Sequence, residues 1–326
     1  MNTIYHFSGA GNDFVVIDGR EGDVSQYREV PRIQALCKEH KTDGLMILGQ
    51  EMPGQAGHDG DSTGSPTVMA DPDRPSVDFS MEFYNPDGSG GMMCGNGGRC
   101  IVAFADYLGI RPGCRPALRQ AQGPGMEQVA EPVEVPAEYL FRAPDGLHTG
   151  EILARPEERL WEVRIKMIDV QGITPILGGY FLNTGTRHFV KFVDDVEKVD
   201  IDTEGRALRW NEAFAPVGTN VNFVHVAPDG LHVRTFEKGV EGETLACGTG
   251  LTASAIAAYQ ISRLHPVGSA RNDNTPVIST KAGGRVEKSY RLRARQDWLS
   301  VNFTPGADEK FTDVYLTGPA RLVEIL

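Results

Sequence analysis

The sequence has few cysteines and no excess of positive charge, and both features limit what the protein can be. Five cysteines in 326 residues make an odd count, which argues against a scaffold held together by disulfides. The formal net charge of −12 argues against a groove for nucleic acid or a docking face for an anionic membrane. A small-molecule substrate is compatible with both features.

Long apolar runs, targeting signals and common cofactor motifs are also missing. No run approaches the roughly 20 residues of a membrane-spanning helix, and the start, MNTIYHFSGAGNDFVVID, does not read as a signal peptide. The sequence shows no glycine-rich nucleotide fingerprint and no compelling metal cluster. We therefore expect a cytoplasmic protein without cofactor or metal, and without a nucleic-acid or membrane partner.

The composition that is present is that of a soluble globular protein, with 40% hydrophobic and 23% charged residues. Two segments, near 51–76 and 112–136, are rich in turn-forming or polar residues and are expected to be surface insertions of unknown role. Helical patterns cover 33–40, the segment after Cys94, and 251–262. Strand patterns cover 3–7, 13–18, 44–48, 77–85, 138–143, 147–153, 159–168, 179–185, 188–193, 220–226, 231–237, 286–295, 298–303 and 313–326.

Two cysteines lie in similar glycine-rich settings. MMCGNGGRC contains Cys94 and LACGTGLTA contains Cys247, nearly half the chain apart. Each motif follows strand patterns and opens an apolar helix. This weak repeat predicts two lobes of similar plan, each a sheet wrapped on one helix.

A thiol at the start of a helix has chemical consequences. The first amide groups of a helix have no partner within the helix, and the helix dipole favours negative charge there. We therefore expect a lowered thiol pKa and a docking place for a carboxylate. If two such thiols face each other across a cleft, one can remove a proton from carbon and the other can return one to the opposite face. This is racemisation by two bases.

Less specific interpretations compete with that one. A single Cys-Gly-x-Gly is more often a tight turn with a buried thiol, and Cys37 and Cys114 are expected to be buried thiols of that ordinary kind. The spacing of Cys94 and Cys100 is not usual for zinc. A redox protein would use Cys-x-x-Cys, which is absent, and a binding module would not need two helix-start thiols.

Five stretches resemble the diaminopimelate epimerase family from end to end: GAGNDFVVID, FYNPDGSGGMMCGNGGRC, GTNVNFV, RTFEKGVEGETLACGTG and VYLTGPA. The resemblance implies an α+β fold of two pseudo-symmetric lobes, each a mixed, mostly antiparallel sheet rolled around a central helix. It places one lobe at 1–172 plus 314–326 with Cys94, and the other at 173–313 with Cys247, with the active site between them. A homodimer would be consistent with the family.

The implied function is epimerisation of LL-2,6-diaminopimelate to the meso form, for lysine and peptidoglycan precursors, without a cofactor. The alternative is a cofactor-independent racemase or epimerase of another amino acid, of the proline or hydroxyproline type. Cys94 and Cys247 correspond to the family's acid/base thiols, and His188 to a supporting residue. The residues that correspond to substrate-binding positions are Asn12, Asn85, Gly95, Asn96, Thr186, Asn220, Glu237, Lys238, Gly248 and Thr249.

Departures from the family pattern cluster where the distal end of the substrate would bind. Thr186 replaces an asparagine, and Lys238 replaces an arginine that binds the distal carboxylate. Lysine keeps the charge but loses the bidentate fork. In addition, the segment EHKTDG is shortened and KGVEGET is one residue longer than usual. The resemblance is therefore firmer for the chemistry at the thiols than for the choice of substrate.

Overall fold

The computed structural model describes residues 2–20, 22–50, 76–91, 93–113, 138–264, 277–282 and 285–326. Cys114 and most of the two expected insertions lie outside these ranges. Within the described residues, no helix is both long and apolar enough to cross a membrane.

The described chain is mostly strand, with four α-helices among the described residues. The strands are β1 (Ile4–Gly9), β2 (Asn12–Asp18), β3 (Gly44–Gly49), β4 (Phe79–Tyr84), β5 (Glu138–Ala143), β6 (Gly146–Glu157), β7 (Leu160–Lys166), β8 (Ile173–Ile176), β9 (Gly179–Asn183), β10 (Arg187–Phe192), β11 (Asn220–Ala227), β12 (Gly230–Glu237), β13 (Gly242–Thr244), β14 (Val277–Ala282), β15 (Arg285–Arg293), β16 (Trp298–Pro305) and β17 (Phe311–Ile325). The helices are α1 (Val30–His40), α2 (Gly95–Tyr107), α3 (Arg206–Arg209) and α4 (Gly248–Leu264). Short helical turns are η1 (Ser25–Arg28), η2 (Val196–Lys198), η3 (Ile201–Gly205) and η4 (Glu212–Phe214).

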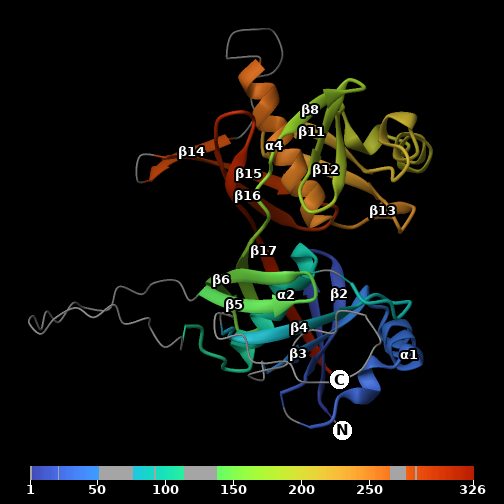
Figure 1. Cartoon of the computed structure of the whole chain (residues 1–326), viewed down its shortest axis with the longest axis vertical. Coiled ribbons are helices and arrows are strands. Elements are labelled where there is room, and N and C mark those ends of the chain that lie inside the picture. Colours follow the sequence, from blue (N-terminus) through green and yellow to red (C-terminus); the bar gives the residue numbers. More distant parts are fainter. Residues whose placement is uncertain are drawn as a thin grey trace, which may run out of the picture.

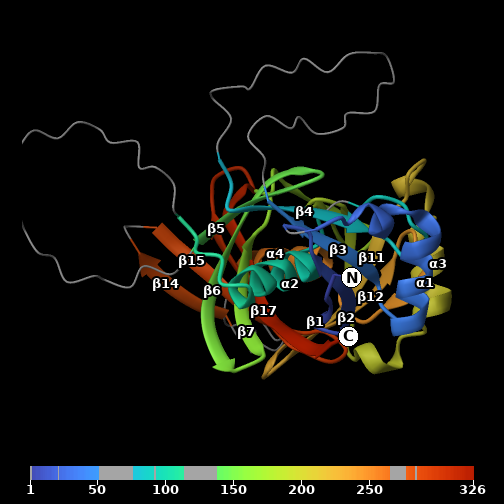
Figure 2. The same cartoon turned by 90° about the horizontal axis from the view of Figure 1, so that it is seen from below.

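The lower body in Figure 1 is a barrel closed around α2. Its strands pair in the order β17–β1–β2–β3–β4–β5–β6–β7, and β7 pairs again with β17. The pairs β2–β3 and β4–β5 are parallel and the others antiparallel. Seen from below, these strands surround α2 (Figure 2).

The upper body repeats this plan around α4 (Figure 1). Its strands pair in the order β8–β9–β10–β11–β12–β15–β16–β17, with β13 and β14 at the margins. In the upper body, the pairs β10–β11 and β12–β15 are parallel, and the other pairs from β9 to β17 are antiparallel. The second and fourth pairs are thus the parallel ones, as they are from β1 to β7 in the lower body. In each body the central helix comes between the fourth and fifth of these strands, so the two bodies are related by pseudo-symmetry.

Both central helices are buried on nearly every face because strands enclose them. In α2, all residues from Gly95 to Ala105 are buried, including Ile101 and Phe104. In α4, Leu251 and Ile256 are buried among small residues. A helix buried in this way belongs to a core, so the surrounding sheet fixes where each helix starts.

Strand β17 joins the two bodies. Its first half pairs with β16 in the upper body, and its second half pairs with β7 and β1 in the lower body. The backbone N–H of Leu326 donates to the carbonyl of Ile4 at 2.8 Å, so the chain ends lie together. The residue ranges of the two lobes stay a prediction.

The structure confirms the α+β class and the two similar halves, and it adds elements that the sequence patterns did not indicate. The strands expected from periodicity are present, and Asp229 with Gly230 forms the turn of a β11–β12 hairpin. Strands β8 and β13 were missed because four and three residues are too few to show a period. Strand β14 and the short helical turns were missed as well.

Candidate active site

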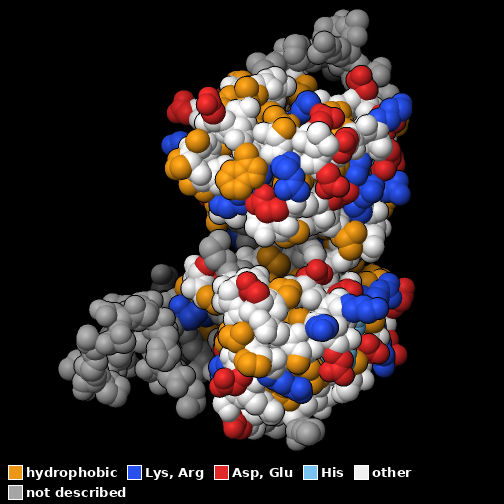
Figure 3. Space-filling model, turned by 90° about the vertical axis from the view of Figure 1, so that its right-hand side faces the viewer, with side chains coloured by type: hydrophobic (Ala, Val, Ile, Leu, Met, Phe, Trp, Pro, Cys, Tyr) orange, Lys and Arg blue, Asp and Glu red, His pale blue; other side chains and the backbone are white. Residues whose placement is uncertain are grey.

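A cleft of about 1560 Å³ lies between the two bodies and is lined by residues of both. Figure 3 shows the molecule hollowed at this level. The cleft is lined by nearly all of the residues that the sequence singled out: Asn12, Asn85, Cys94, Gly95, Asn96, Thr186, Asn220, Glu237, Lys238, Cys247, Gly248 and Thr249. His188 is fully buried behind its wall. The two thiols predicted to act together are thus brought to one cavity.

The starts of α2 and α4 meet at the floor of this cleft through two glycines. A Cβ atom on Gly248 would lie 3.5 Å from the Cα of Gly95. A Cβ on either glycine would also lie 2.8 Å from Cδ2 of Leu316, which comes from β17 beneath them. Any larger residue would separate the helices or displace Leu316. The glycines are therefore required for the close approach that places Cys94 and Cys247 in one cavity.

Cys94 is the residue that caps the start of α2. Its backbone is extended, and its sulfur accepts a hydrogen bond from the N–H of Gly97 at 3.2 Å. The N–H of Gly98 donates to the carbonyl of Cys94 at 2.8 Å. The thiol thus occupies the place where a serine or aspartate usually caps a helix.

A buried arginine lies one turn further along α2. Arg99 has no exposed surface, and it donates to the carbonyl of Gly95 at 3.2 Å and to Oδ1 of Asn96 at 2.9 Å. Burial lowers the pKa of Arg99 to about 10. The amide nitrogen of Asn96 donates in turn to Asn12 and to the carbonyl of Ala246, which comes from the other body. Arg99 was not singled out from the sequence, and it holds the first turn of α2 beside Cys94.

Cys247 precedes α4 and has different neighbours. Its sulfur lies 3.4 Å from the hydroxyl oxygen of Thr249, and the N–H of Leu251 donates to its carbonyl at 2.9 Å. Thr249 Oγ1 is 2.9 Å from Nε2 of His188. Burial lowers the pKa of His188 to about 3, so the imidazole is neutral at pH values near neutrality. The Cys247 thiol is therefore in contact with a chain of neutral polar side chains.

The expected lowering of the thiol pKa is wrong for this structure. Burial raises the pKa of Cys94, and it raises the pKa of Cys247 to about 12. The negative charge of Glu237 raises both further, while the amide of Gly97 and the hydroxyl of Thr249 lower them. The helix starts act in the expected direction, but the cost of placing a thiolate inside the protein is larger.

The other residues predicted to bind substrate differ in how many hydrogen bonds their side chains already make within the protein. Asn220 accepts from the N–H of Lys238 at 2.7 Å and donates to Thr186 at 3.1 Å, so both ends of its amide are engaged. Asn85 donates to Ser89 at 3.0 Å. The side chain of Lys238 is exposed at the mouth of the cleft.

Two other cysteines behave as ordinary core residues. Cys37 packs in the cluster between α1 and the sheet, and Cys100 lies on the inner face of α2, where a Cβ on Gly9 would touch its sulfur. Both are free thiols, and burial raises the pKa of each. The interpretation of Cys37 as an ordinary buried thiol is confirmed, and Cys100 packs in the same way, whereas Cys114 lies outside the described residues.

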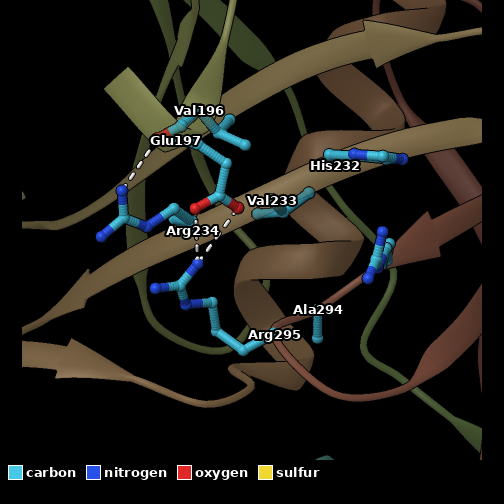
Figure 4. Close-up of a pocket in the computed structure, with 8 residues that line it drawn as sticks. Val196, Glu197, His232, Val233, Arg234, Ala294 and Arg295 are labelled. Carbon is cyan, nitrogen blue, oxygen red and sulfur yellow. Dashed lines mark hydrogen bonds and ion pairs between the residues drawn. The ribbon is translucent and has the colours of Figure 1, made fainter. Parts of the chain in front are cut away.

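A second pocket, of about 40 Å³, lies on the upper body (Figure 4). Arg295 pairs there with Glu197, and Arg234 donates to the carbonyl of Val196, as the dashed lines show. It is too small for an amino-acid substrate, and none of its lining residues is a thiol. Among the residues that the structure describes, no group of three or more His, Cys, Asp or Glu is arranged to hold a metal ion.

Comparison with known proteins assigns a family to this geometry. The family model for diaminopimelate epimerase matches residues 180–294. The diaminopimelate epimerase of Chlorobaculum tepidum is 32% identical, over 97% of this chain and 97% of its own length. That of Aquifex aeolicus is 40% identical, over 78% of this chain and 80% of its own length. The chain belongs to the diaminopimelate epimerase family. The resemblance drawn from the sequence motifs is thereby confirmed.

Solved structures of lower identity share the fold. A hydroxyproline epimerase from Agrobacterium vitis superposes with a TM-score of 0.54 at 14% identity, covering 100% of this chain and 90% of that one. A PhzF-family phenazine biosynthesis protein from Enterococcus faecalis superposes with a TM-score of 0.53 at 13% identity, covering 100% and 98%. At these identities the likeness shows the two-body architecture and no more.

Proposed function

We propose that the protein is an isomerase that converts LL-2,6-diaminopimelate to meso-diaminopimelate, with Cys94 and Cys247 as its two acid/base groups. Family membership supports the substrate. The observation that carries the mechanism is that two thiols, each at the start of a buried helix, line one cleft from opposite bodies. The product would serve lysine and peptidoglycan precursor synthesis.

The proposed reaction moves one proton off the substrate and another onto it. One cysteine, as thiolate, takes the α-proton and becomes a thiol, leaving an electron pair on the α-carbon that is delocalised into the carboxylate. The other cysteine, as thiol, gives its proton to the opposite face and becomes a thiolate. The α-carbon is inverted, the charge of the site is unchanged, and the two thiols have exchanged roles.

The raised thiol pKa values suit this task. The α-proton of an amino acid is a very weak acid, and a thiolate formed against the cost of burial is a stronger base than an exposed one. The substrate brings an α-ammonium group into the cleft, and that positive charge offsets the cost of a thiolate. Glu237 supplies a second negative group for the ammonium, and burial raises its pKa as well.

The helix starts are the proposed seat of the α-carboxylate. The first amides of α2 and α4, at Gly95, Asn96, Gly248 and Thr249, have no partner within their helices. They converge on one floor because the two helix starts approach so closely that a Cβ added to Gly248 would lie 3.5 Å from the Cα of Gly95. Donors fixed in this way stabilise the charge that develops on the carboxylate when the α-proton leaves.

The distal end of the substrate has weaker candidates. Asn85 and Thr186 line the cleft, and Lys238 stands at its mouth. We assign the distal carboxylate to the Lys238 ammonium, which acts as a point charge where the family has an arginine. No cofactor enters this scheme, and we place the enzyme in the cytoplasm, where a reducing environment keeps opposed thiols free.

The substrate assignment is tested by comparing amino acids under identical conditions. The purified chain should convert LL-diaminopimelate to the meso form without added cofactor. It should convert proline and hydroxyproline at least about 10³-fold less efficiently, because these substrates leave the polar groups of the distal site unpaired. Lysine, which lacks only the carboxylate assigned to the exposed Lys238, should be converted a few-fold less efficiently. Comparable efficiency on proline or hydroxyproline would favour the alternative racemase.

A further inference from the structure

The orientation of a buried amide, that of Asn222, is fixed by its neighbours. Its Nδ2 lies 3.2 Å from the carbonyl oxygen of Phe189, which can only accept. Its Oδ1 accepts a hydrogen bond from the hydroxyl of Thr235 at 3.0 Å. Reversing the amide would place two oxygens against each other at Phe189, so the amide nitrogen must face this way. Asn222 has no exposed surface, so bulk water does not compete for these bonds.

The fixed amide decides which nitrogen of His188 carries the proton. Asn222 Nδ2 lies 3.0 Å from Nδ1 of His188. Because the amide nitrogen is a donor, Nδ1 must accept and therefore carries no hydrogen. The imidazole is neutral, since burial lowers the pKa of His188 to about 3. Its single N–H is consequently on Nε2.

From Nε2 the hydrogen bonds lead to one of the two thiols. His188 Nε2 lies 2.9 Å from Oγ1 of Thr249 and 2.9 Å from Oγ1 of Thr186. Thr186 also accepts from the amide nitrogen of Asn220 at 3.1 Å. That nitrogen lies 3.5 Å from Nε2, a longer contact than the 3.0 Å between Asn222 Nδ2 and Nδ1, so the Asn222 contact decides the tautomer. Because Nε2 carries the hydrogen, Thr249 cannot donate to the ring. Its hydroxyl hydrogen therefore points away from His188, where Oγ1 of Thr186 at 3.3 Å and the sulfur of Cys247 at 3.4 Å are the acceptors within reach.

Packing at the start of α4 supports this arrangement. A Cβ on Gly250 would collide with the amide oxygen of Asn222, so the glycine lets the helix approach the strand that carries the amide. Asn222 on β11 and Thr235 on β12 are direct cross-strand partners. The ionisable groups that act on Cys247 are Glu237 from β12 and Cys94 from the start of α2, and neither belongs to the chain of donors.

We propose that Asn222 is a positioning residue that sets the Nε2–H tautomer of His188, so that His188 and Thr249 form a one-way chain of hydrogen bonds donating to the sulfur of Cys247. The chain stabilises the thiolate at Cys247 and cannot take a proton from it, because Nε2 already carries one. His188 thus acts as a donor and not as a base. This inference rests on the proposed function, in which Cys247 alternates between thiol and thiolate.

The tautomer can be observed without any enzymatic assay. Long-range proton–nitrogen spectra of isotope-labelled protein, with His188 assigned by comparison with His188→Gln, should show a bare Nδ1 and a protonated Nε2. In Asn222→Asp the new carboxylate accepts from the ring, and the proton should move to Nδ1. A protonated Nδ1 in the unaltered protein would overturn the proposal directly.

The effect on the thiol is measured by alkylation of both cysteines in the same sample. Iodoacetamide is added at one fixed pH, and modification of Cys94 and Cys247 is followed by peptide mass spectrometry. In Thr249→Val, the rate at Cys247 should fall about tenfold, the loss expected for one hydrogen bond to a charged group, while the rate at Cys94 is unchanged. Thr249→Ser keeps the hydroxyl and should match the unaltered protein.

Asn222→Leu should slow alkylation at Cys247 and not at Cys94, and should lower kcat/KM about tenfold in both reaction directions, because the equilibrium constant fixes their ratio. If this variant does not fold, the Thr249 pair carries the test. Equal slowing at both cysteines would reveal a merely structural role and overturn the proposal. A different result would contradict the proposed function, namely that Cys247→Ala keeps its activity. The alkylation result does not depend on that measurement.

Discussion

The two helix-start thiols occupy equivalent places in two pseudo-symmetric bodies, yet their surroundings differ. The sulfur of Cys94 accepts from a backbone amide, and the buried cation of Arg99 lies on the same helix. The sulfur of Cys247 meets a threonine hydroxyl backed by a neutral histidine. Burial raises the pKa of both. The comparison shows that the shared fold places the thiols, while unrelated side chains compensate each thiolate.

The largest effect should come from removing either thiol. Cys94→Ala and Cys247→Ala should each lower kcat/KM by about 10⁴-fold, because each leaves one face of the α-carbon without an acid/base group. Epimerisation of diaminopimelate, followed by chiral separation, measures this. Cys37→Ala is the control and should keep its activity, since that thiol packs in a separate cluster and does not line the cleft. Substantial turnover by one helix-start variant alone would mean that the sites are not partners.

The second prediction concerns the neutral histidine on the Cys247 side. Its pKa is about 3 in the folded protein against 6.5 for the exposed group. At pH values below the pKa of the unfolded chain, His188 is protonated in the unfolded chain but stays neutral in the folded one. The free energy of unfolding therefore decreases as pH falls from about 6.5 towards 3. Between about pH 7 and pH 5 the loss from this group is about 2 kcal/mol.

Denaturant unfolding at the two pH values measures this loss. His188→Gln should lack this share of the pH dependence, and Arg99→Lys, on the other side of the comparison, should retain it. An unchanged pH dependence in His188→Gln would show that another group is responsible.

The third prediction concerns the buried cation on the Cys94 side. Arg99→Met should raise the pKa of Cys94 further, because it removes a nearby positive charge that lowers this pKa. The rate of alkylation at Cys94 should fall about tenfold, with no change at Cys247. Arg99→Lys keeps the charge and should preserve most of the rate. Equal slowing at both thiols in Arg99→Met would indicate that the cation serves the whole cleft.

Features of the fold and the site that depend on residues close together in the sequence could be predicted from it, and features that depend on distant residues could not. The glycine-rich motifs predicted two thiols at helix starts, and the strand patterns predicted two similar sheets. The thiol pKa was predicted in the wrong direction because the enclosing strands are distant in sequence. Arg99 was overlooked for the same reason, since one of its acceptors is the carbonyl of Pro319.

Asn222 could have been noticed from the sequence. It follows Asn220 by two residues in NVNFV, and alternate residues of a strand share a face. Two asparagines on one face of an otherwise apolar strand indicate a buried polar network. Only the structure shows that His188 completes that network, because the two strands pair at residues more than thirty positions apart.

The smallest effect is expected at the mouth of the cleft, away from both thiols. Lys238→Met should lower kcat/KM for diaminopimelate by a few-fold, about 0.5–1 kcal/mol, because the ammonium is exposed and water weakens its attraction for a carboxylate. Raised salt should reduce the difference between the variant and the unaltered chain. A loss of 100-fold or more would mean that the lysine is enclosed when substrate binds.

The central claim, that two different groups serve the two faces of one carbon, is tested most directly by isotope incorporation in deuterium oxide. LL-diaminopimelate is incubated with the protein and sampled early, before the reverse reaction matters. The account predicts deuterium at the inverted α-carbon of nearly every meso product and almost none in the remaining LL-substrate, because the proton taken by one cysteine is not returned to the same face. Deuterium appearing in the LL-substrate as fast as in the product would contradict the account and point to a single base that serves both faces.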